Sequence, residues 1–226
     1  MSAQPATNTP PDPEIGRSVR AAGLATNYIE AGAGPPLVLI HGSGPGVTSY
    51  ANWRLVIPPL AKQNRVLALD VAGFGYTERA PGATYDMAYW LAHLLGFLDA
   101  LSLPRVNLIG NSFGGGLALA FAARHPERVD RFVMMGAAGA RFQLTPGLDA
   151  VWGYQPSLEN MRRLIELFAY DQALVSEDLV RLRYQASVRP GYQETYAAMF
   201  PRHGSATSIA WRRPRIKCAR STRTCC

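Results

Sequence analysis

Short apolar runs alternate with amphipathic stretches along the first 140 residues. Strands covered by helices on both faces read as continuous apolar runs, and four such runs predict buried strands. They occupy residues 35–42, 65–70, 105–110 and 128–136. The pattern also predicts two shorter strands, at 18–22 and 25–30, and three helices, at 52–64, 87–102 and 113–126. Pro58 and Pro59 must kink or divide the first of these helices. This alternation favours right-handed crossovers and a mostly parallel sheet with helices on both faces, an α/β fold.

The pattern changes after about residue 140, where helical spacing continues but no strand is predicted. Three helices are expected there, at 156–172, 176–187 and 192–200. A helical block after a core of alternating strands and helices is typical of a cap placed on top of that core. We therefore expect a disordered leader (1–14), a core (15–140), a helical cap (141–200) and a basic tail (201–226).

The net charge of +7 lies in the tail. Residues 201–226 hold seven Lys and Arg, no acid and all three cysteines, which leaves equal numbers of basic and acidic side chains in residues 1–200. Such a run is usually a solvated tail; a nucleic-acid arm is the alternative, but few aromatic side chains could stack on bases. Cys225 and Cys226 are adjacent and lack the spacing of a zinc site.

The sequence predicts neither a secretory signal nor a transmembrane helix. The start is polar and rich in proline, without the apolar stretch of a secretory signal. No apolar run has the length that a transmembrane helix needs. We expect a cytoplasmic protein.

A G-N-S-F-G sequence at 110–114 follows a predicted buried strand and opens a predicted glycine-rich helix. This is the strand–turn–helix setting of a nucleophile elbow, in which a sharp turn exposes the Ser112 hydroxyl at the end of the strand. The small glycines let strand and helix approach, and the helix N-terminus stabilises a developing negative charge. We predict that Ser112 is a nucleophile; a structural serine in a glycine-rich turn is the alternative.

An H-G-S-G-P-G sequence at 41–46 follows another predicted strand. Acyl chemistry needs two N–H donors where the carbonyl oxygen becomes negative. We expect the backbone of Phe113, directly after the nucleophile, and the backbone of Ser43 to form this oxyanion hole. His41 could be a catalytic base, but a histidine that braces the loop is the preferred interpretation.

With these motifs in place, the chain resembles the α/β-hydrolase superfamily, and within it the meta-cleavage-product hydrolases of bacterial aromatic degradation. The resemblance rests on H-G-S-G-P-G, A-N-W-R, D-V-A-G-F-G-Y-T, G-N-S-F-G-G-G and V-W-G-Y-Q-P-S, and covers roughly residues 14–200. It is strongest to the 2-hydroxymuconate semialdehyde hydrolases. It implies an α/β-hydrolase core with a helical cap.

The resemblance implies hydrolysis of a carbon–carbon bond in a small dienoate substrate, without cofactor or metal, and a homo-oligomer. It also implies substrate-binding roles for Asn52, Asn111 and Arg189, with Arg189 able to clamp a carboxylate through two hydrogen bonds. The alternatives are a solvated arginine at a helix end and, for Asn111, an asparagine that stabilises its turn. No partner nucleic acid or membrane is expected.

The remaining triad members are expected after the cap, since the order in this fold is Ser, then Asp or Glu, then His. The last acid of the chain is Glu194, and the only later histidine is His203. His93 and His125 fall in or beside predicted helices. We therefore expect the triad Asp and His to be absent from this chain, together with the later core strands. Without those strands, the strand at 128–136 should keep an unpaired edge and an uncovered apolar face.

A shift of reading frame after about Phe200 accounts for the tail. One back-translation of residues 201–214, read two bases later, gives P-A-R-Q-R-Y-V-D-R-L-A-S-P, an amphipathic continuation of the cap. A genuine basic tail is the alternative. Two other functions remain open: an ester hydrolase on the same fold, and a non-catalytic product whose tail binds anions.

Overall fold

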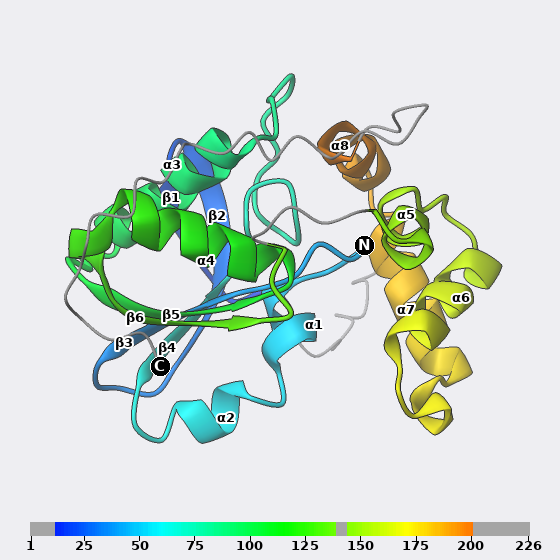
Figure 1. The fold of residues 1–226 in the computed structure, drawn as a ribbon, viewed down its shortest axis with the longest axis horizontal. Coiled ribbons are helices and arrows are strands. Elements are labelled where there is room, and N and C mark those ends of the chain that lie inside the picture. The colour runs from blue at the N-terminus through cyan, green and yellow to red at the C-terminus, as the bar shows by residue number, and fades with distance from the viewer. Residues whose placement is uncertain (1–11, 139–143, 201–226) are drawn as a thin grey trace, which may run out of the picture.

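The structure, a computed structural model, describes residues 12–138 and 144–200. Its centre is a six-stranded sheet in the order β1-β2-β4-β3-β5-β6 (Figure 1). The strands are β1 (Arg17–Ala21), β2 (Leu24–Ala31), β3 (Pro36–Ile40), β4 (Arg65–Leu69), β5 (Val106–Asn111) and β6 (Val129–Met135). The first two pairings of this order are antiparallel and the other three are parallel. This confirms the predicted mostly parallel sheet.

Helices cover both faces of the sheet (Figure 1). Because successive side chains of a strand point to opposite faces, Val38 and Ile40 of β3 join the large core under one helix pair. Leu37 and Leu39 of the same strand join a smaller core under the other pair. The pair over the large core is α3 (Met87–Ala100) and α4 (Phe113–Arg124), and the other pair is α1 (Ser49–Trp53) and α2 (Ile57–Leu60).

The helix expected at 52–64, with a kink or division caused by its two prolines, is indeed divided. It is replaced by α1 and α2, which are separated at residues 54–56. The side chain of Thr48 caps α1 by accepting the Ala51 N–H at 3.0 Å. Pro58 and Pro59 fall in the first turn of α2, where a missing N–H costs nothing.

Four further helices, which we call the cap helices, lie beside the end of the sheet where β5 ends (Figure 1). The last three confirm the helices predicted from the sequence, whereas the first was not predicted. The first three each begin after a Thr or Ser that accepts an N–H three residues on. They are α5 (Pro146–Trp152), α6 (Leu158–Phe168), α7 (Glu177–Ser187) and α8 (Tyr192–Met199). Two short 3-10 turns, η1 (Pro126–Arg128) and η2 (Gln172–Leu174), connect neighbouring elements.

The strand at 128–136 is not buried as its apolar sequence suggested, but its unpaired edge and uncovered apolar face are those expected if the later core strands are missing. Strand β6 forms an edge of the sheet, and among the described residues no strand pairs with its outer side. Val133 is 53% exposed and Met135 is 49% exposed. An apolar strand is buried only where neighbours cover it, and here the covered side is the one that faces β5 and α4.

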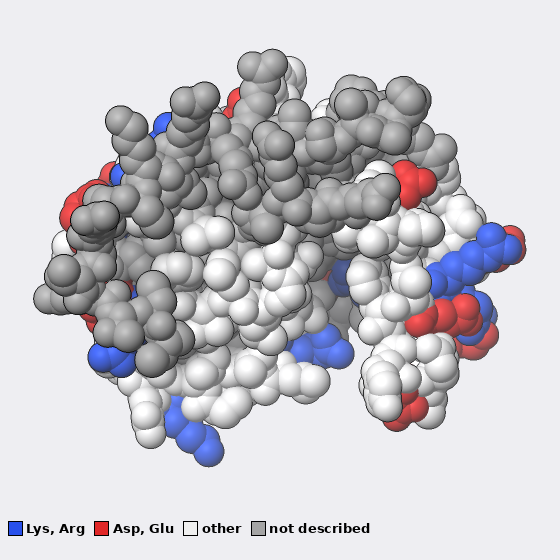
Figure 2. Space-filling model, in the orientation of Figure 1, with Lys and Arg blue, Asp and Glu red and all other residues white. Residues whose placement is uncertain are grey.

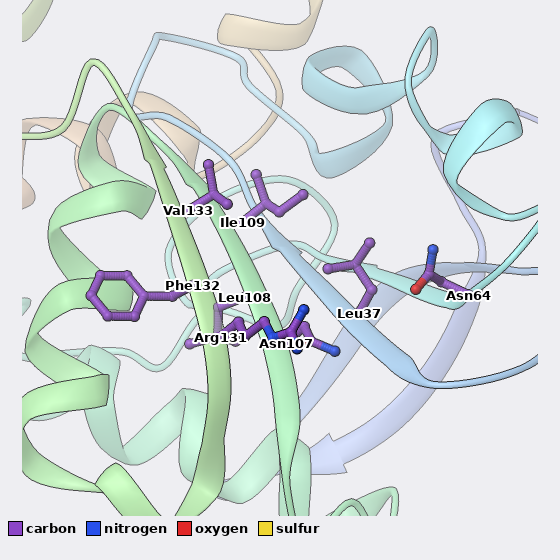
Figure 3. A pocket seen from close by; sticks show the side chains of 8 residues that line it. All are labelled: Leu37, Asn64, Asn107, Leu108, Ile109, Arg131, Phe132 and Val133. Carbon is purple, nitrogen blue, oxygen red and sulfur yellow. The ribbon is translucent and has the colours of Figure 1, made fainter. Parts of the chain in front are cut away.

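A groove of about 280 Å³ follows this uncovered part of the sheet. Leu37, Ile109 and Val133 extend into it from three adjacent strands, while Phe132 points away from them (Figure 3). On the face drawn in Figure 2, charged side chains gather on the cap helices and few lie on the described surface over the sheet. The edge is therefore apolar as well as unpaired.

Candidate active site

Ser112 stands in a strained turn between β5 and α4. Its φ of 51° and ψ of −114° are unusual for a residue with a side chain, so the surroundings must hold it there. Its N–H donates to the Met135 carbonyl at 2.8 Å, and its carbonyl accepts the N–H groups of Gly116 and Ala138 at 3.2 and 3.1 Å. The side chain is half-buried and makes no capping bond to the helix. The predicted conformation of the elbow is confirmed.

Two glycines make the turn possible by close packing. A Cβ on Gly110 would lie 2.2 Å from the Gly114 carbonyl oxygen, and a Cβ on Gly114 would lie 2.3 Å from the carbonyl oxygen of Ile40. Real Cβ atoms do not approach oxygen so closely. The glycines therefore bring β5, α4 and the end of β3 together, as the sequence predicted.

The loop at 41–46 lies directly beside the elbow. A Cβ placed on Gly42 would be 3.5 Å from the Ser112 Cβ. The Gly42 N–H donates to Asn52 Oδ1 at 3.1 Å, and Asn111 Nδ2 donates to the same oxygen at 3.0 Å. Two residues predicted to bind substrate, Asn52 and Asn111, thus meet each other at the loop and next to Ser112.

Phe113, whose backbone N–H is predicted to be one of the two oxyanion donors, is the first residue of α4. Its ring is almost fully buried. It packs edge-on against Trp90 at 4.8 Å between centroids and against Phe74 at 5.6 Å. This packing anchors the residue that follows the nucleophile.

His41 braces the loop and is not placed as a base. Because the Gly42 carbonyl can only accept, His41 Nδ1 donates to it at 2.6 Å, and Nε2 accepts the Val71 N–H at 3.0 Å. Both ring nitrogens are occupied, and burial lowers the pKa of His41 below its usual value despite the opposing effect of Asp70. The preferred interpretation from the sequence is supported.

The other described histidines are also engaged elsewhere. His93 bonds Thr26 at 2.8 Å and accepts the Ala72 N–H at 3.3 Å, and burial lowers its pKa to about 4. His125 caps the far end of α4, about 20 Å along the helix from Ser112 at 1.5 Å per residue. His203 lies outside the described residues.

Ser43 is held by the cap helices. Its Oγ accepts the indole N–H of Trp152 at 3.0 Å, and its carbonyl accepts the Tyr196 hydroxyl at 3.0 Å. Neither partner of Ser43 was predicted from the sequence. The spacing of Tyr192 and Tyr196, four residues apart in a predicted helix, is the signal that could have indicated a shared aromatic face.

Arg189 lies near this group but bonds elsewhere. Its Nε donates to the Ala186 carbonyl at 3.1 Å, and its guanidinium lies 4.0 Å above the Tyr76 ring. Both terminal nitrogens are buried and have no hydrogen-bond partner. A buried guanidinium with unpaired N–H groups is costly, so this position favours binding an anion.

Titratable side chains lie near Arg189. Tyr76 donates to Asp12 at 2.6 Å, and burial and this bond raise its pKa to about 12. Burial raises the pKa of the Glu14 carboxyl, although Arg183 and Arg189 oppose that shift. Asp12 and Glu14, which were predicted to belong to the leader, therefore lie close to Tyr76 and Arg189.

The described ranges contain no group of three or more His, Cys, Asp or Glu side chains placed to hold a metal ion. None of their helices combines the length and apolar character needed to cross a membrane.

Comparison with known proteins agrees with this geometry. Residues 35–208 match the family model described as alpha/beta hydrolase fold. The chain is 60% identical to a 2-hydroxymuconate semialdehyde hydrolase of Pseudomonas sp. (strain CF600), over 84% of this chain and 67% of that protein. It is 60% identical to a 2-hydroxy-6-oxo-2,4-heptadienoate hydrolase of Pseudomonas putida, over 83% and 68%.

Solved structures of hydrolases are similar to this chain as well. The meta-cleavage product hydrolase CumD from Pseudomonas fluorescens IP01 superposes with a TM-score of 0.83 and 56% identity, covering 84% of this chain and 70% of that one. A serine hydrolase from the polyaromatic-hydrocarbon-degrading bacterium Cycloclasticus zankles has a TM-score of 0.76 and 31% identity, covering 81% and 69%. With a strained serine between β5 and α4 and the glycine-rich loop beside it, the chain belongs to the α/β-hydrolase fold family.

Proposed function

We propose that this site serves the hydrolysis of a carbon–carbon bond in a 2-hydroxymuconate semialdehyde-type ring-cleavage product. The relatives named above act on substrates of this class. The observation that carries the proposal is the meeting of Ser112, in its strained turn, with the Gly42 loop and the Asn52–Asn111 pair. Water is consumed: its hydroxyl joins the acyl fragment, and its hydrogen replaces the broken bond on the dienol fragment.

In this proposal Ser112 attacks the substrate carbonyl or assists attack on it. The carbonyl oxygen becomes negative and accepts hydrogen bonds from the backbone N–H groups of Phe113 and Ser43. Such donors act best where water is excluded and where they need not reorient. Burial of both residues supports this arrangement.

The dienoate end of the substrate is assigned to Arg189 and the two asparagines. The unpartnered terminal nitrogens of Arg189 suit a carboxylate, which accepts two parallel N–H groups. Asn52 and Asn111 offer amide groups for the enol or carbonyl oxygens. The described residues thus supply a nucleophile, oxyanion donors and binding groups, while His41 and His93 are occupied by other bonds.

Binding of a dienoate tests the proposal independently of turnover. Calorimetric titration of the 226-residue chain with 2-hydroxypenta-2,4-dienoate should show saturable binding. Arg189→Gln should weaken it by about tenfold or more, since a charged hydrogen bond is lost. Arg181→Gln, an exposed arginine of the neighbouring helix α7, is the matched control and should change it less than twofold.

Two results would argue against the assignment. Equal binding by the Arg189 and Arg181 variants would remove Arg189 from the site. Absence of dienoate binding, together with hydrolysis of a simple ester that depends on Ser112, would favour an ester hydrolase on the same fold.

A further inference from the structure

The proposed oxyanion donor Ser43 lies in a loop that its own sequence does not make rigid. The loop G-S-G-P-G contains three glycines, and Gly46 has a φ of 67°. Glycine loses more backbone freedom on folding than any other residue. One internal bond, from the Val47 N–H to the Gly44 carbonyl at 3.1 Å, spans part of it. Partners from other elements must therefore fix Ser43.

Helix α8 provides two of these partners from one buried face. Tyr192 and Tyr196 are four residues apart, fully buried, and nearly parallel with ring centroids 6.1 Å apart. Their hydroxyls donate to successive carbonyls of the loop, Tyr196 to Ser43 at 3.0 Å and Tyr192 to Gly44 at 3.4 Å. Two tyrosines one helical turn apart thus bond two successive carbonyls of the loop.

Helix α5 completes the contact. The Tyr196 hydroxyl also lies 2.9 Å from the Val151 carbonyl, so its single hydrogen is shared between the loop and α5. Trp152, the next residue, donates its indole N–H to Ser43 Oγ. Burial raises the pKa of Tyr196 well above its usual value, which keeps the hydroxyl protonated and able to donate.

The two peptide groups that flank Ser43 are consequently fixed from opposite sides. His41, from the end of β3, holds the Gly42 carbonyl, and Tyr196, from the cap helices, holds the Ser43 carbonyl. In a planar trans peptide the N–H points opposite to the carbonyl of the same unit. The Gly42 carbonyl and the Ser43 N–H belong to one peptide unit, so His41 sets the direction of that N–H. Tyr196 holds the following unit, and its bond restricts rotation of the backbone on the other side of Ser43.

We propose that Tyr196 is a positioning residue: it holds the Ser43 carbonyl from the cap helices and so restricts the backbone rotation that would turn the Ser43 N–H away, with Trp152 as its partner on the Ser43 side chain. The proposal rests on the oxyanion role assigned to Ser43. It makes the cap helices part of the oxyanion hole, beyond any contact that they make with substrate. Loss of the Tyr196 hydroxyl should loosen the loop without disturbing Phe113, whose position depends on core packing.

The test compares Tyr196→Phe with Tyr154→Phe in the full chain by nuclear magnetic resonance. Tyr154 is a matched control, because it is a buried cap tyrosine whose hydroxyl bonds Ser187 within the cap helices and not the loop. Amide exchange is followed at Gly42 and Val47, whose N–H groups are bonded on either side of Ser43. Tyr196→Phe should speed exchange there about fivefold, and Tyr154→Phe should not.

A ligand titration separates this proposal from the proposed function. Formate, a carboxylate of the size of the expected acyl fragment, should shift the amide resonances of both Ser43 and Phe113 in the unmodified chain. In Tyr196→Phe the Ser43 response should weaken while that of Phe113 persists. No formate response at either amide would overturn the oxyanion assignment but leave the exchange result standing. Equal exchange in all three proteins, or equal acceleration in both variants, would overturn the positioning role.

Discussion

Replacing Gly114 with alanine should destabilise the fold, although the same change normally favours a helix. Gly114 lies in the first turn of α4, where alanine is preferred over glycine by about 1 kcal/mol. The added Cβ, however, would lie 2.3 Å from the Ile40 carbonyl oxygen and 2.6 Å from that of His41. Both oxygens belong to the backbone at the end of β3, so no side-chain rotation relieves the overlap.

The size of the effect follows from what must move. Strand β3 is paired on both sides, by β4 and β5, and cannot shift without disturbing two ladders. Overpacking of a well-packed core costs about 1–3 kcal/mol. Because the overlap is with backbone atoms, we place the cost of Gly114→Ala at the upper end of this range. The helix preference of alanine offsets about 1 kcal/mol of it. We therefore expect the free energy of unfolding to fall by about 2 kcal/mol.

Urea unfolding followed by circular dichroism measures this change. Gly44→Ala is the matched control, because a Cβ there meets nothing within 4 Å and the residue does not have a positive φ. Its stability should be unchanged or slightly increased, since alanine restricts the unfolded chain. A Gly114→Ala variant at least as stable as the unmodified chain would refute the close-packing explanation of the elbow.

Three further predictions concern the edge of the sheet, buried histidine and turnover. Self-association of the chain should rise with concentration in sedimentation experiments and should weaken in Val133→Lys on β6, whereas Leu55→Lys, at an equally apolar but isolated site, should not weaken it. The folded-state pKa of His93, about 4, lies below its unfolded value near 6.5, so as the pH falls the unfolded chain binds this proton first. The free energy of unfolding should therefore be constant above pH 6.5 and fall by up to about 3 kcal/mol toward pH 4. In His93→Gln its dependence on pH should be weaker. Loss of the 2-hydroxymuconate semialdehyde chromophore should be about 10⁴-fold or more slower with the 226-residue chain than with a version continued in the shifted frame after residue 200, because no histidine of residues 12–138 and 144–200 is placed as a base for Ser112. Comparable rates would point to His41 as the base.

The positions of the core elements were predictable because each is strongly patterned over its own length. A buried strand such as β5 is continuously apolar, and the glycines of the elbow occur only where strand and helix meet. Helix α5 was missed because it is short and opens with Pro146 and Gly147, which indicate a turn when read alone. Its capping bond from Thr145 and the burial of Trp152 depend on the rest of the fold.

The candidate site likewise has a part that was predictable from local sequence and a part that was not. Ser112 and the loop beside it follow from local motifs, since their chemistry requires a tight turn at a strand end. The apolar residues of β6 alone suggested a buried strand, since they say nothing about whether a neighbour covers them; its exposed edge was predictable only from the expected absence of later strands. Likewise, Tyr196 reads as one more apolar position of a helix, and its bond to Ser43 joins residues 153 apart in the sequence. Contacts of this range depend on how the cap helices sit on the core.

The exposed edge and the nucleophile are physically connected. Ser112 donates to the Met135 carbonyl at the end of β6 and accepts from Ala138 just beyond it, so the strained turn is tied to the edge strand. Fraying of β6 would release those bonds and let Ser112 leave its unfavourable backbone conformation. A partner that pairs with the outer side of β6 would oppose fraying and so support the elbow. The edge of the sheet therefore bears on the geometry of the nucleophile as well as on association.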